Sequence, residues 1–490
     1  MRRLWEGLVL SLVVSAAPGA AAEFVREPNT LLVGEQLVST GSKQHLTTGD
    51  RVADFAWCPR GELLAYAARS YGRVIVGLVL RYGGRPITAD LPGSSGRLGW
   101  SADGDSLLVS TSGRRGESAG LWLLAVSRKG SEMAKLKPRR IFSAAEIGSF
   151  ACPSKAERVA VACRQLPQRP GEEGAKEIVV LNLRDDSRQS LGEWGEGLSF
   201  DASGRFLSYR AVQQQPDGST ASCQVVCDLE TGEKKKQERR ASDDTRPSPD
   251  GARIARAITG AGTDLVVRDL TSGAGLRLTW NGASRFAAWS PDSQIVAYIR
   301  GYPVNDDRRE TVATVPTLWL AAATGPDAGR QMMVGVVDAD SPVKWSDDGE
   351  ALAFLADGDL CAADVNSRPL RVRERIALGV PVTEEMIRQE AVSNAKQIAL
   401  ALLMYAEDHD HAFPPSGADI AEAIAPYLTS QELFYHPAQP DQFIFKYLLP
   451  EGTNLSDIAD AANTIVAVLD LGGPEEVLCY ADGHVTVRRK

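Results

Sequence analysis

One run of five residues, Glu407-Asp408-His409-Asp410-His411, holds the densest group of side chains that could bind a metal ion. Carboxylate oxygens are the ligands that Ca²⁺ prefers, whereas imidazole nitrogens suit transition metals. Crowded carboxylates are costly to keep ionised, and a divalent cation would relieve that cost. The sequence therefore predicts Glu407, Asp408 and Asp410 as candidate ligands for Ca²⁺. The alternative is a solvated helix end, because acidic runs commonly lie in solvent.

A second motif, Gly116-Glu117-Ser118-Ala119-Gly120, matches the G-x-S-x-G turn that carries a nucleophilic serine in some hydrolases. That turn needs a strand before it, a helix after it, and an acid and then a histidine later in the chain. Here an expected strand, Leu121 to Val126, follows at once. The only histidine before residue 381 is His45, which precedes the serine. The context therefore argues against a catalytic Ser118.

A third group, Asp306, Asp307, Arg308, Arg309 and Glu310, forms the densest charge cluster in a long loop. Loops that collect insertions on one face of a repeat protein often form its binding face. We therefore expect these five residues to contact a ligand, with a solvated loop tip as the alternative.

A repeat defines the elements that position these groups. The stretch Trp289-Ser290-Pro291-Asp292-Ser293 joins two runs rich in aromatic and β-branched residues, which indicates a strand, a tight turn and a strand. Degraded copies follow an aromatic residue or its replacement at positions 57, 100, 150, 200, 247, 289 and 345, at spacings of 42 to 56 residues. A period of about 40 to 50 residues with four strands each is typical of propeller blades.

Through these copies, residues 50 to 375 resemble the TolB-type, WD40-like propeller repeats of exported bacterial proteins. The resemblance implies a mainly β fold with a seven-bladed β-propeller over residues 24–378. Six or eight blades are the alternatives, because Pro247 replaces the aromatic residue and residues 152–155 lack the Asp-Gly turn. Residues Asn29 to Thr48 form no full repeat, so we expect them to add a strand to a terminal blade and close the ring.

The strands of such a blade are named A to D, and the short A–B turns lie at the opposite end of the ring from the B–C loops. The B–C loops of this chain are long, variable and charged, which makes their end of the ring the expected binding face. They are expected at Gly113 to Gly120, Leu166 to Lys176, Gln213 to Thr220 and Gly301 to Thr314.

The pattern changes at Pro381, where Thr383 precedes two glutamates, a signal for the start of a helix. Apolar residues at helical spacing then form one stripe from Ile387 to Tyr405. Strand candidates follow, and Asp482-Gly483 between alternating residues predicts a hairpin. Residues 381–490 are therefore expected to form a small α+β domain, with 17 acidic and 6 basic residues.

This region resembles the C-terminal globular part of bacterial pilin-like (pseudopilin-like) proteins that end in an Asp-Gly-His motif. The residues that carry the resemblance are Asn394 to Asp408, Phe413-Pro414, Ala425 to Leu428 and Tyr480 to Val485. The resemblance implies a pilin-like fold in which Asp482 and His484 seat the last hairpin. The apolar N-terminal helix through which that family packs into filaments is absent here, and the propeller stands in its place.

The N-terminus combines Arg2-Arg3, an apolar run from Leu8 to Val14 and a small-residue site at Ala20-Ala21-Ala22. These parts in that order predict a signal peptide over residues 1–22, and hence a periplasmic or extracellular protein without an integral membrane segment after cleavage. The seven cysteines are expected to act mostly as small core residues. A net charge of −9 argues against a nucleic-acid partner.

The leading functional hypothesis is an exported, non-catalytic binding or scaffolding protein whose propeller recognises a protein or cell-envelope ligand. One alternative is a hydrolase or lyase with its site in the propeller channel, which would require titratable side chains that converge there. The other is a structural component of a secretion or pilus-like assembly that acts through residues 381–490. Apart from Ca²⁺, no cofactor is expected.

Overall fold

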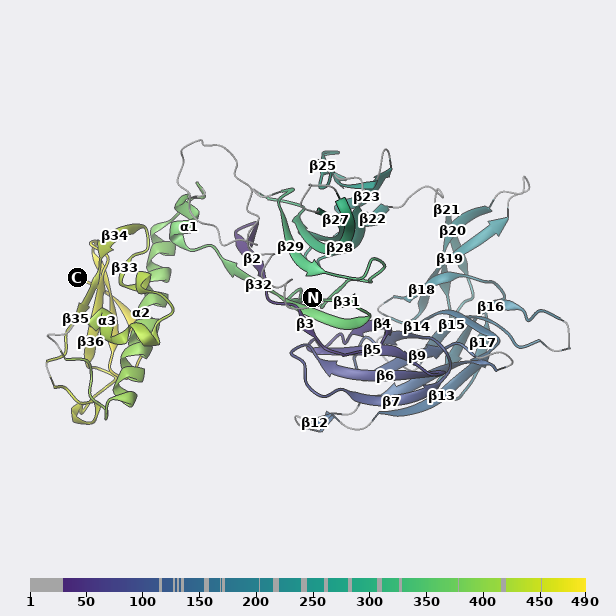
Figure 1. Cartoon of the computed structure of the whole chain (residues 1–490), viewed down its shortest axis with the longest axis horizontal. Helices are drawn as coiled ribbons and strands as arrows, with labels where there is room; N and C mark the ends of the chain where they lie inside the picture. The colour runs from purple at the N-terminus through teal and green to yellow at the C-terminus, as the bar shows by residue number, and fades with distance from the viewer. Residues whose placement is uncertain are drawn as a thin grey trace. The chain divides into compact units, whose positions relative to one another are not determined.

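The structure of the chain, a computed structural model, is shown in Figure 1. It divides into a first unit, Asn29–Arg368, and a second unit that begins at Pro369 and ends at Lys490. The predicted signal peptide, residues 1–22, lies outside the described residues. The described residues are 30–490 without 114–116, 127, 130–131, 134–135, 154–157, 168, 170–171, 202, 215–219, 239–244, 260–262, 281–283, 306–310, 326–327, 378, 416–419 and 451.

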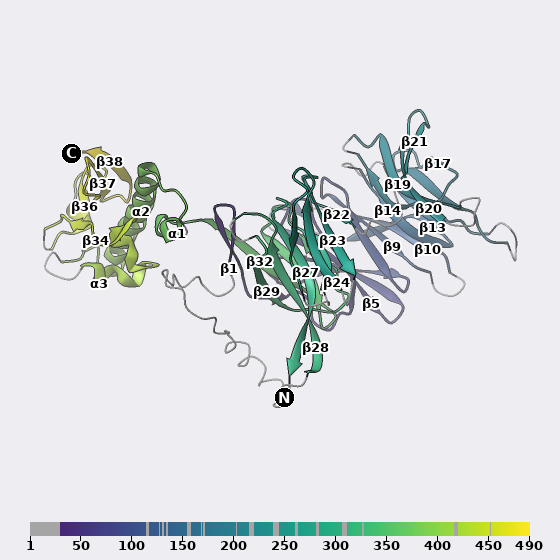
Figure 2. The same ribbon diagram turned by 90° about the horizontal axis from the view of Figure 1, so that it is seen from above.

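Six four-stranded antiparallel sheets follow one another along the described part of the first unit, and we number them sheets 1 to 6 in chain order. Each one pairs its strands in the order of the sequence, because short apolar runs alternate with turn residues (Figures 1 and 2). A small hairpin, β11 (Arg128–Lys129) and β12 (Glu132–Met133), interrupts sheet 2.

The strands of sheets 1 to 3 are β4 (Val52–Trp57), β5 (Leu63–Ser70), β6 (Arg73–Leu80) and β7 (Ile87–Pro92); β8 (Gly96–Trp100), β9 (Ser106–Thr111), β10 (Ala119–Ala125) and β13 (Lys137–Ala144); and β14 (Glu146–Ala151), β15 (Arg158–Arg164), β16 (Lys176–Asn182) and β17 (Arg188–Ser190). The strands of sheets 4 to 6 are β18 (Glu196–Phe200), β19 (Phe206–Gln214), β20 (Thr220–Asp228) and β21 (Lys234–Glu238); β22 (Thr245–Pro247), β23 (Arg253–Thr259), β24 (Thr263–Asp269) and β25 (Gly275–Arg277); and β26 (Ser284–Trp289), β27 (Ile295–Asn305), β28 (Thr311–Ala322) and β29 (Gln331–Val336).

One further sheet, the closing sheet, combines strands from both ends of the first unit. In Figures 1 and 2 the purple N-terminal strands lie beside the green strand β32, and Gln44 pairs with Ala362. This confirms the prediction that residues 29–48 join a terminal blade. The pairing covers a strand edge that would otherwise expose unpaired backbone groups. Its strands are β1 (Thr30–Val33), β2 (Gln36–Thr40), β3 (Gln44–His45), β30 (Lys344–Trp345), β31 (Ala351–Ala356) and β32 (Asp359–Pro369).

The tryptophan of the repeat connects sheets 1, 2 and 6 to the sheet before each of them. The indole N–H groups donate to backbone carbonyl oxygens of the preceding sheet: Trp57 Nε1 to Lys344 O at 2.9 Å, Trp100 Nε1 to Ala56 O at 3.1 Å and Trp289 Nε1 to Arg246 O at 2.9 Å. Trp289 is also buried in one cluster with Leu265 and Val267 of sheet 5, which confirms the predicted packing between neighbouring blades.

The serine and aspartate of the repeat build the A–B turn. Ser290 Oγ donates to Asp292 Oδ1 and accepts from the Ile295 N–H at 2.9 Å, so the buried hydroxyl is satisfied on both sides. The same donation to the aspartate two residues later occurs at Ser101, Ser248 and Ser346, each at 2.5 Å. These residues therefore fix the turn, as their local hydrogen-bonding habit predicts.

In two pairs of adjacent sheets the first strands lie side by side, β4 beside β8 and β14 beside β18. Successive four-stranded sheets arranged in this way are typical of a β-propeller, and the predicted mainly β fold is confirmed. All seven cysteines are free and six are buried, as expected of small core residues. Burial raises the pKa of the Cys163 thiol to about 12, which leaves it protonated and unreactive near neutral pH.

The second unit is one long helix packed on a four-stranded antiparallel sheet, as the sequence predicts. Helix α2 (Glu384–Asp408) begins after Thr383, whose Oγ1 accepts from the Met386 N–H at 3.3 Å. Ala395, Ile398 and Leu402 of its apolar stripe are buried in the core of this unit. No helix in the described part of the chain is long and apolar enough to cross a membrane.

The boundary between the units falls earlier than the predicted residues 378–381, because helix α1 (Val372–Ala377) belongs to the second unit. The Val372 N–H donates to Glu390 Oε2 of α2 at 2.6 Å.

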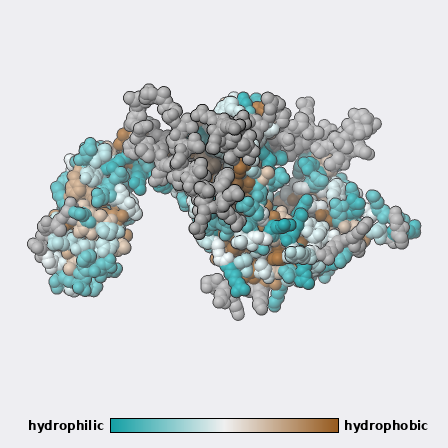
Figure 3. Space-filling view, viewed as in Figure 1, coloured by the Kyte–Doolittle hydropathy of each residue, from teal (hydrophilic) through white to brown (hydrophobic). Residues whose placement is uncertain are grey.

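Hydrophilic residues cover much of the visible face of this unit in Figure 3. Its remaining elements are α3 (Ile420–Ile424), η1 (Ala425–Tyr427), η2 (Gln431–Phe434), η3 (Leu455–Asp457), β33 (Tyr435–His436), β34 (Gln439–Phe443), β35 (Phe445–Tyr447), β36 (Ile465–Asp470), β37 (Glu475–Tyr480) and β38 (Val485–Arg489).

Candidate functional site

The predicted binding cluster, Asp306, Asp307, Arg308, Arg309 and Glu310, lies outside the described residues. The strands on either side of it, β27 and β28, form a long hairpin from Ile295 to Ala322. These are the second and third strands of sheet 6, which correspond to strands B and C of a blade.

The predicted metal-binding run lies at the end of α2, where the helix stops at Asp408. Asp408 Oδ2 accepts from the Tyr427 hydroxyl at 2.7 Å, and the His409 ring stacks on Tyr405 with centroids 3.8 Å apart. Asp410 and His411 both adopt a left-handed backbone conformation, so the run does not continue one helical face. Throughout the described residues, no three His, Cys, Asp or Glu side chains are grouped so that they could hold a metal ion. The carboxylates of Glu407, Asp408 and Asp410 are therefore not brought together.

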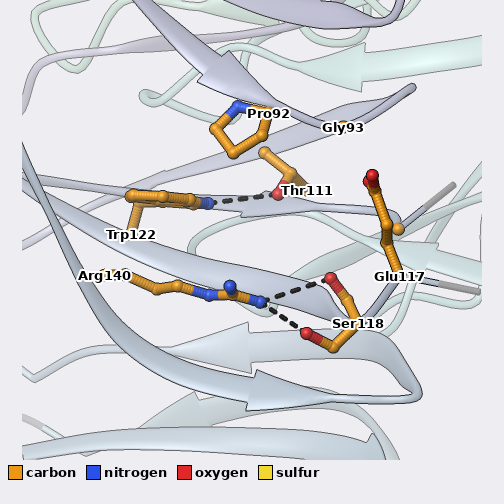
Figure 4. Close-up of a pocket in the computed structure, with 8 residues that line it drawn as sticks. Pro92, Gly93, Thr111, Glu117, Ser118, Trp122 and Arg140 are labelled. Atoms are coloured by element: carbon orange, nitrogen blue, oxygen red, sulfur yellow. Dashed lines mark hydrogen bonds between the residues drawn. The ribbon is translucent and has the colours of Figure 1, made fainter.

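A pocket of ≈ 360 Å³ lies at the B–C end of sheet 2 (Figure 4). Its lining comes from the β9–β10 loop, from β10 and β13, and from the connection between sheets 1 and 2. We call it the sheet-2 pocket. Its lining residues are Pro92, Gly93, Thr111, Gly113, Glu117, Ser118, Trp122 and Arg140.

The floor of the sheet-2 pocket is a fixed pair of side chains, Trp122 and Arg140. Trp122 Nε1 donates to Thr111 Oγ1 at 3.1 Å, which orients the indole ring. The Arg140 guanidinium lies 5.7 Å from the centroid of that ring, within the range of a cation–π contact. Arg140 Nη2 donates to Ser118 Oγ at 2.8 Å, to Ser118 O at 3.2 Å and to Ala119 O at 3.1 Å. These bonds tie the β9–β10 loop to β13 and hold the guanidinium in place.

Two glycines allow the walls to come this close. At Gly113 an added Cβ would lie 2.1 Å from Glu117 O, so the loop can return on itself only without a side chain there. At Gly93, which has φ +137°, an added Cβ would lie 2.8 Å from the Cβ of Thr111. Substitution of either glycine would therefore force the backbone around Glu117 or Thr111 to move.

The environment of Ser118 confirms that the G-x-S-x-G match is not a nucleophile turn. Strand β10 begins at Ala119, where that motif would require a helix. Ser118 Oγ accepts from Arg140, a permanent cation that cannot remove its proton. The pocket lining contains no histidine, and its one carboxylate belongs to Glu117. The lining therefore lacks the histidine base that acyl transfer through Ser118 would require.

Two charged residues, Asp54 of β4 and Lys344 of β30, are engaged in structural contacts. Asp54 Oδ2 accepts from the Leu98 N–H at 2.9 Å, and Asp54 Oδ1 accepts from Lys344 Nζ at 3.1 Å. These contacts connect sheet 1 to sheet 2 and to the closing sheet. Asp54 and Lys344 therefore bind to each other and to the backbone, and not to a shared reaction centre.

The sequence directed attention to Ser118 but missed Trp122 and Arg140, which line the same pocket. Trp122 and Arg140 lie in strands where alternation alone does not distinguish a pocket residue from any other exposed side chain. Arg140 meets Ser118 because β13 pairs with β10, and a β-bulge between Leu121 and Trp122 shifts the register there. Without that pairing, nothing in the sequence indicates that Trp122 and Arg140 lie beside each other.

No family model matches the chain, and no curated protein matches it. Among solved structures, the chain is similar to the β-propeller domain of Cps50 (Swd1) from Myceliophteria thermophila, with 14% identity and a TM-score of 0.40, over 66% of this chain and 100% of that one. It is also similar to the β-propeller domain of the Trilobed protease from Pyrococcus furiosus, with 10% identity and a TM-score of 0.40, over 65% of this chain and 96% of that one.

Proposed function

We propose that the chain is an exported, non-catalytic binding or scaffolding protein whose propeller recognises a protein or cell-envelope ligand. In this proposal the closing sheet completes a seven-bladed propeller of the TolB type. The observation that carries the proposal is the sheet-2 pocket, where a preorganised arginine, a tryptophan and a carboxylate meet at the B–C end. Concave sites with a few fixed polar groups are the usual form of ligand sites.

The proposal assigns recognition to the first unit and a separate role to the second. We propose a pilin-like fold for the second unit, supported by one long helix on an antiparallel sheet that ends in the Asp482-Gly483-His484 hairpin. The Asp482 carboxylate accepts from the His484 N–H at 3.1 Å and lies 2.5 Å from His484 Nδ1, which suits a residue that seats a turn. The hairpin then contributes structure to the unit and not catalysis.

Partner capture from a cell-envelope extract tests this function. Residues 23–490 and residues 369–490 would each be immobilised, and the captured proteins or envelope material identified by mass spectrometry. We expect a partner that is captured by the longer chain and not by the second unit alone. Equal capture by both would move recognition to the second unit and contradict the proposal.

A further inference from the structure

We infer that the sheet-2 pocket binds an amino-acid head group, a single carbon that carries both an ammonium and a carboxylate. This inference deepens the proposed function and rests on it, because the head group would be the part of the ligand that the propeller recognises. The inference follows from the opposite charges of Glu117 and Arg140, the apolar side chains of Pro92 and Trp122 in the same lining, and the size of the space.

Arg140 supplies the site for the carboxylate. All three of its hydrogen bonds to described residues come from Nη2, so in that part of the chain Nε and Nη1 have no acceptor. A guanidinium presents its donors as a planar fork that matches a carboxylate. Because Ser118 and Ala119 already fix the orientation of this guanidinium, little side-chain entropy would be lost when a carboxylate binds.

Glu117 supplies the site for the ammonium. Its side chain is exposed and lies across the pocket from Trp122 in Figure 4. Arg140 contacts Ser118, Ala119 and the Trp122 ring instead of this carboxylate, so the two charges do not neutralise each other by direct pairing. Among the described residues, neither charge is therefore in an ion pair that a ligand group would have to displace.

The presence of both Glu117 and Arg140 disfavours ligands that carry only one charge. A plain anion that approached Arg140 would meet the like charge of Glu117, and a plain cation that approached Glu117 would meet Arg140. A zwitterion satisfies both residues at once. The space of ≈ 360 Å³ lies near the lower end of the volumes typical of ligand pockets, about 300 to 1,000 Å³, and suits an amino acid or the end of a short peptide branch. Trp122 and Pro92 would line its apolar part.

Calorimetry on residues 23–490 at low salt tests the inference. The probes are glycine, L-alanine, D-alanine and L-leucine, together with N-acetylalanine, which lacks the ammonium, and alaninamide, which lacks the carboxylate. We expect saturable binding of at least one free amino acid. Each alanine derivative should bind at least about tenfold more weakly than the parent amino acid, because it leaves one charged partner unpaired. Absence of binding by all four amino acids, or equal binding of the derivatives, would overturn the inference.

Matched variants locate the binding. Glu117→Gln and Arg140→Gln should each weaken amino-acid binding at least about tenfold. Arg139→Gln, next to Arg140 on the same strand but facing the other side, should leave it unchanged. Arg140 also holds the β9–β10 loop, whereas Glu117 is an exposed loop residue, so Glu117→Gln keeps the test decisive if Arg140→Gln perturbs folding. Unchanged binding in Glu117→Gln would overturn the inference.

The outcome also separates this inference from the proposed function. Partner capture by residues 23–490 without any amino-acid binding would leave the binding function in place and remove the assignment of the head group. Amino-acid binding without partner capture would support the pocket and count against the larger role.

Discussion

The two units of the chain reach stability in different ways. In the first unit neighbouring sheets share apolar clusters, as sheets 5 and 6 do around Trp289. The tryptophan of the repeat in sheets 1, 2 and 6 also bonds to the backbone of the sheet before it. In the second unit a single helix covers a single sheet, and their apolar residues form one core. The comparison teaches that a contact repeated from sheet to sheet builds the first unit, whereas a single shared core builds the second.

The units also differ in charge. Residues 29–368 contain 42 basic and 42 acidic residues, whereas residues 369–490 contain 9 basic and 18 acidic residues, a net charge of −9. Nearly all of the net charge therefore lies in the second unit.

The largest expected effect is on the contact between sheets of the first unit. Trp289→Ala should lower the free energy of unfolding by about 3 to 5 kcal/mol, because a large buried aromatic and its hydrogen bond are lost. Urea denaturation of residues 23–490, followed by tryptophan fluorescence and circular dichroism, would measure it. Only the transition of the first unit should move.

Trp280→Ala is the control for this comparison, because Trp280 is 66% exposed and contacts only Arg277 among the described rings and cations. It should cost no more than about 1 kcal/mol. Equal losses for the two variants would show that the repeated tryptophan has no special role between sheets.

The next effect concerns the start of the second unit. A fragment of residues 381–490 lacks α1, and with it the buried Val372 side chain and the bond from the Val372 N–H to Glu390. It should be less stable than residues 369–490 by about 2 to 4.5 kcal/mol, the sum of one buried aliphatic side chain and one hydrogen bond. Thermal denaturation of the two fragments would measure the difference. Equal melting temperatures would return the boundary to Pro381.

A smaller effect is the pH dependence of the second unit. His436 is buried, and burial together with the Arg373 guanidinium lowers its pKa below the usual 6.5. His436 therefore binds a proton more readily in the unfolded chain than in the folded unit. The contribution of neutral His436 to the stability of the folded unit is complete above pH 6.5. This contribution is lost as the pH falls through the lowered pKa.

Melting of residues 369–490 between pH 7.5 and 5.5 would test this pH dependence. His436→Gln should reduce the loss of stability on acidification, whereas His411→Gln, at an exposed position, should leave it unchanged. The same acid-induced loss in wild type and His436→Gln would assign the effect to other groups.

The sequence predicted what depends on local chemistry. The Ser-Pro-Asp turn, the helix start at Thr383 and the hairpin at Asp482-Gly483 each rest on residues a few positions apart, and the structure contains them. The addition of the N-terminal strands to the closing sheet was also predictable, because an incomplete repeat leaves a strand edge to be covered.

What the sequence could not predict depends on contacts between distant residues. Arg140 reaches Ser118 only through the pairing of β13 with β10, across an inserted hairpin. In the sequence, the acidic run from Glu407 to His411 resembles a set of metal ligands. In three dimensions the backbone at Asp410 and His411 turns to left-handed conformations and Tyr427 bonds to Asp408, neither of which the spacing of the run indicates.

The central claim is that recognition belongs to the first unit and, within it, to the sheet-2 pocket. Hydrogen exchange of residues 23–490, measured with and without a saturating amino acid, tests that claim most directly. The account predicts slower exchange in residues 111–124 and 137–144, which hold the pocket lining on β9, β10 and β13, and no change in residues 369–490. Slower exchange confined to the second unit, or none in the pocket strands, would contradict it.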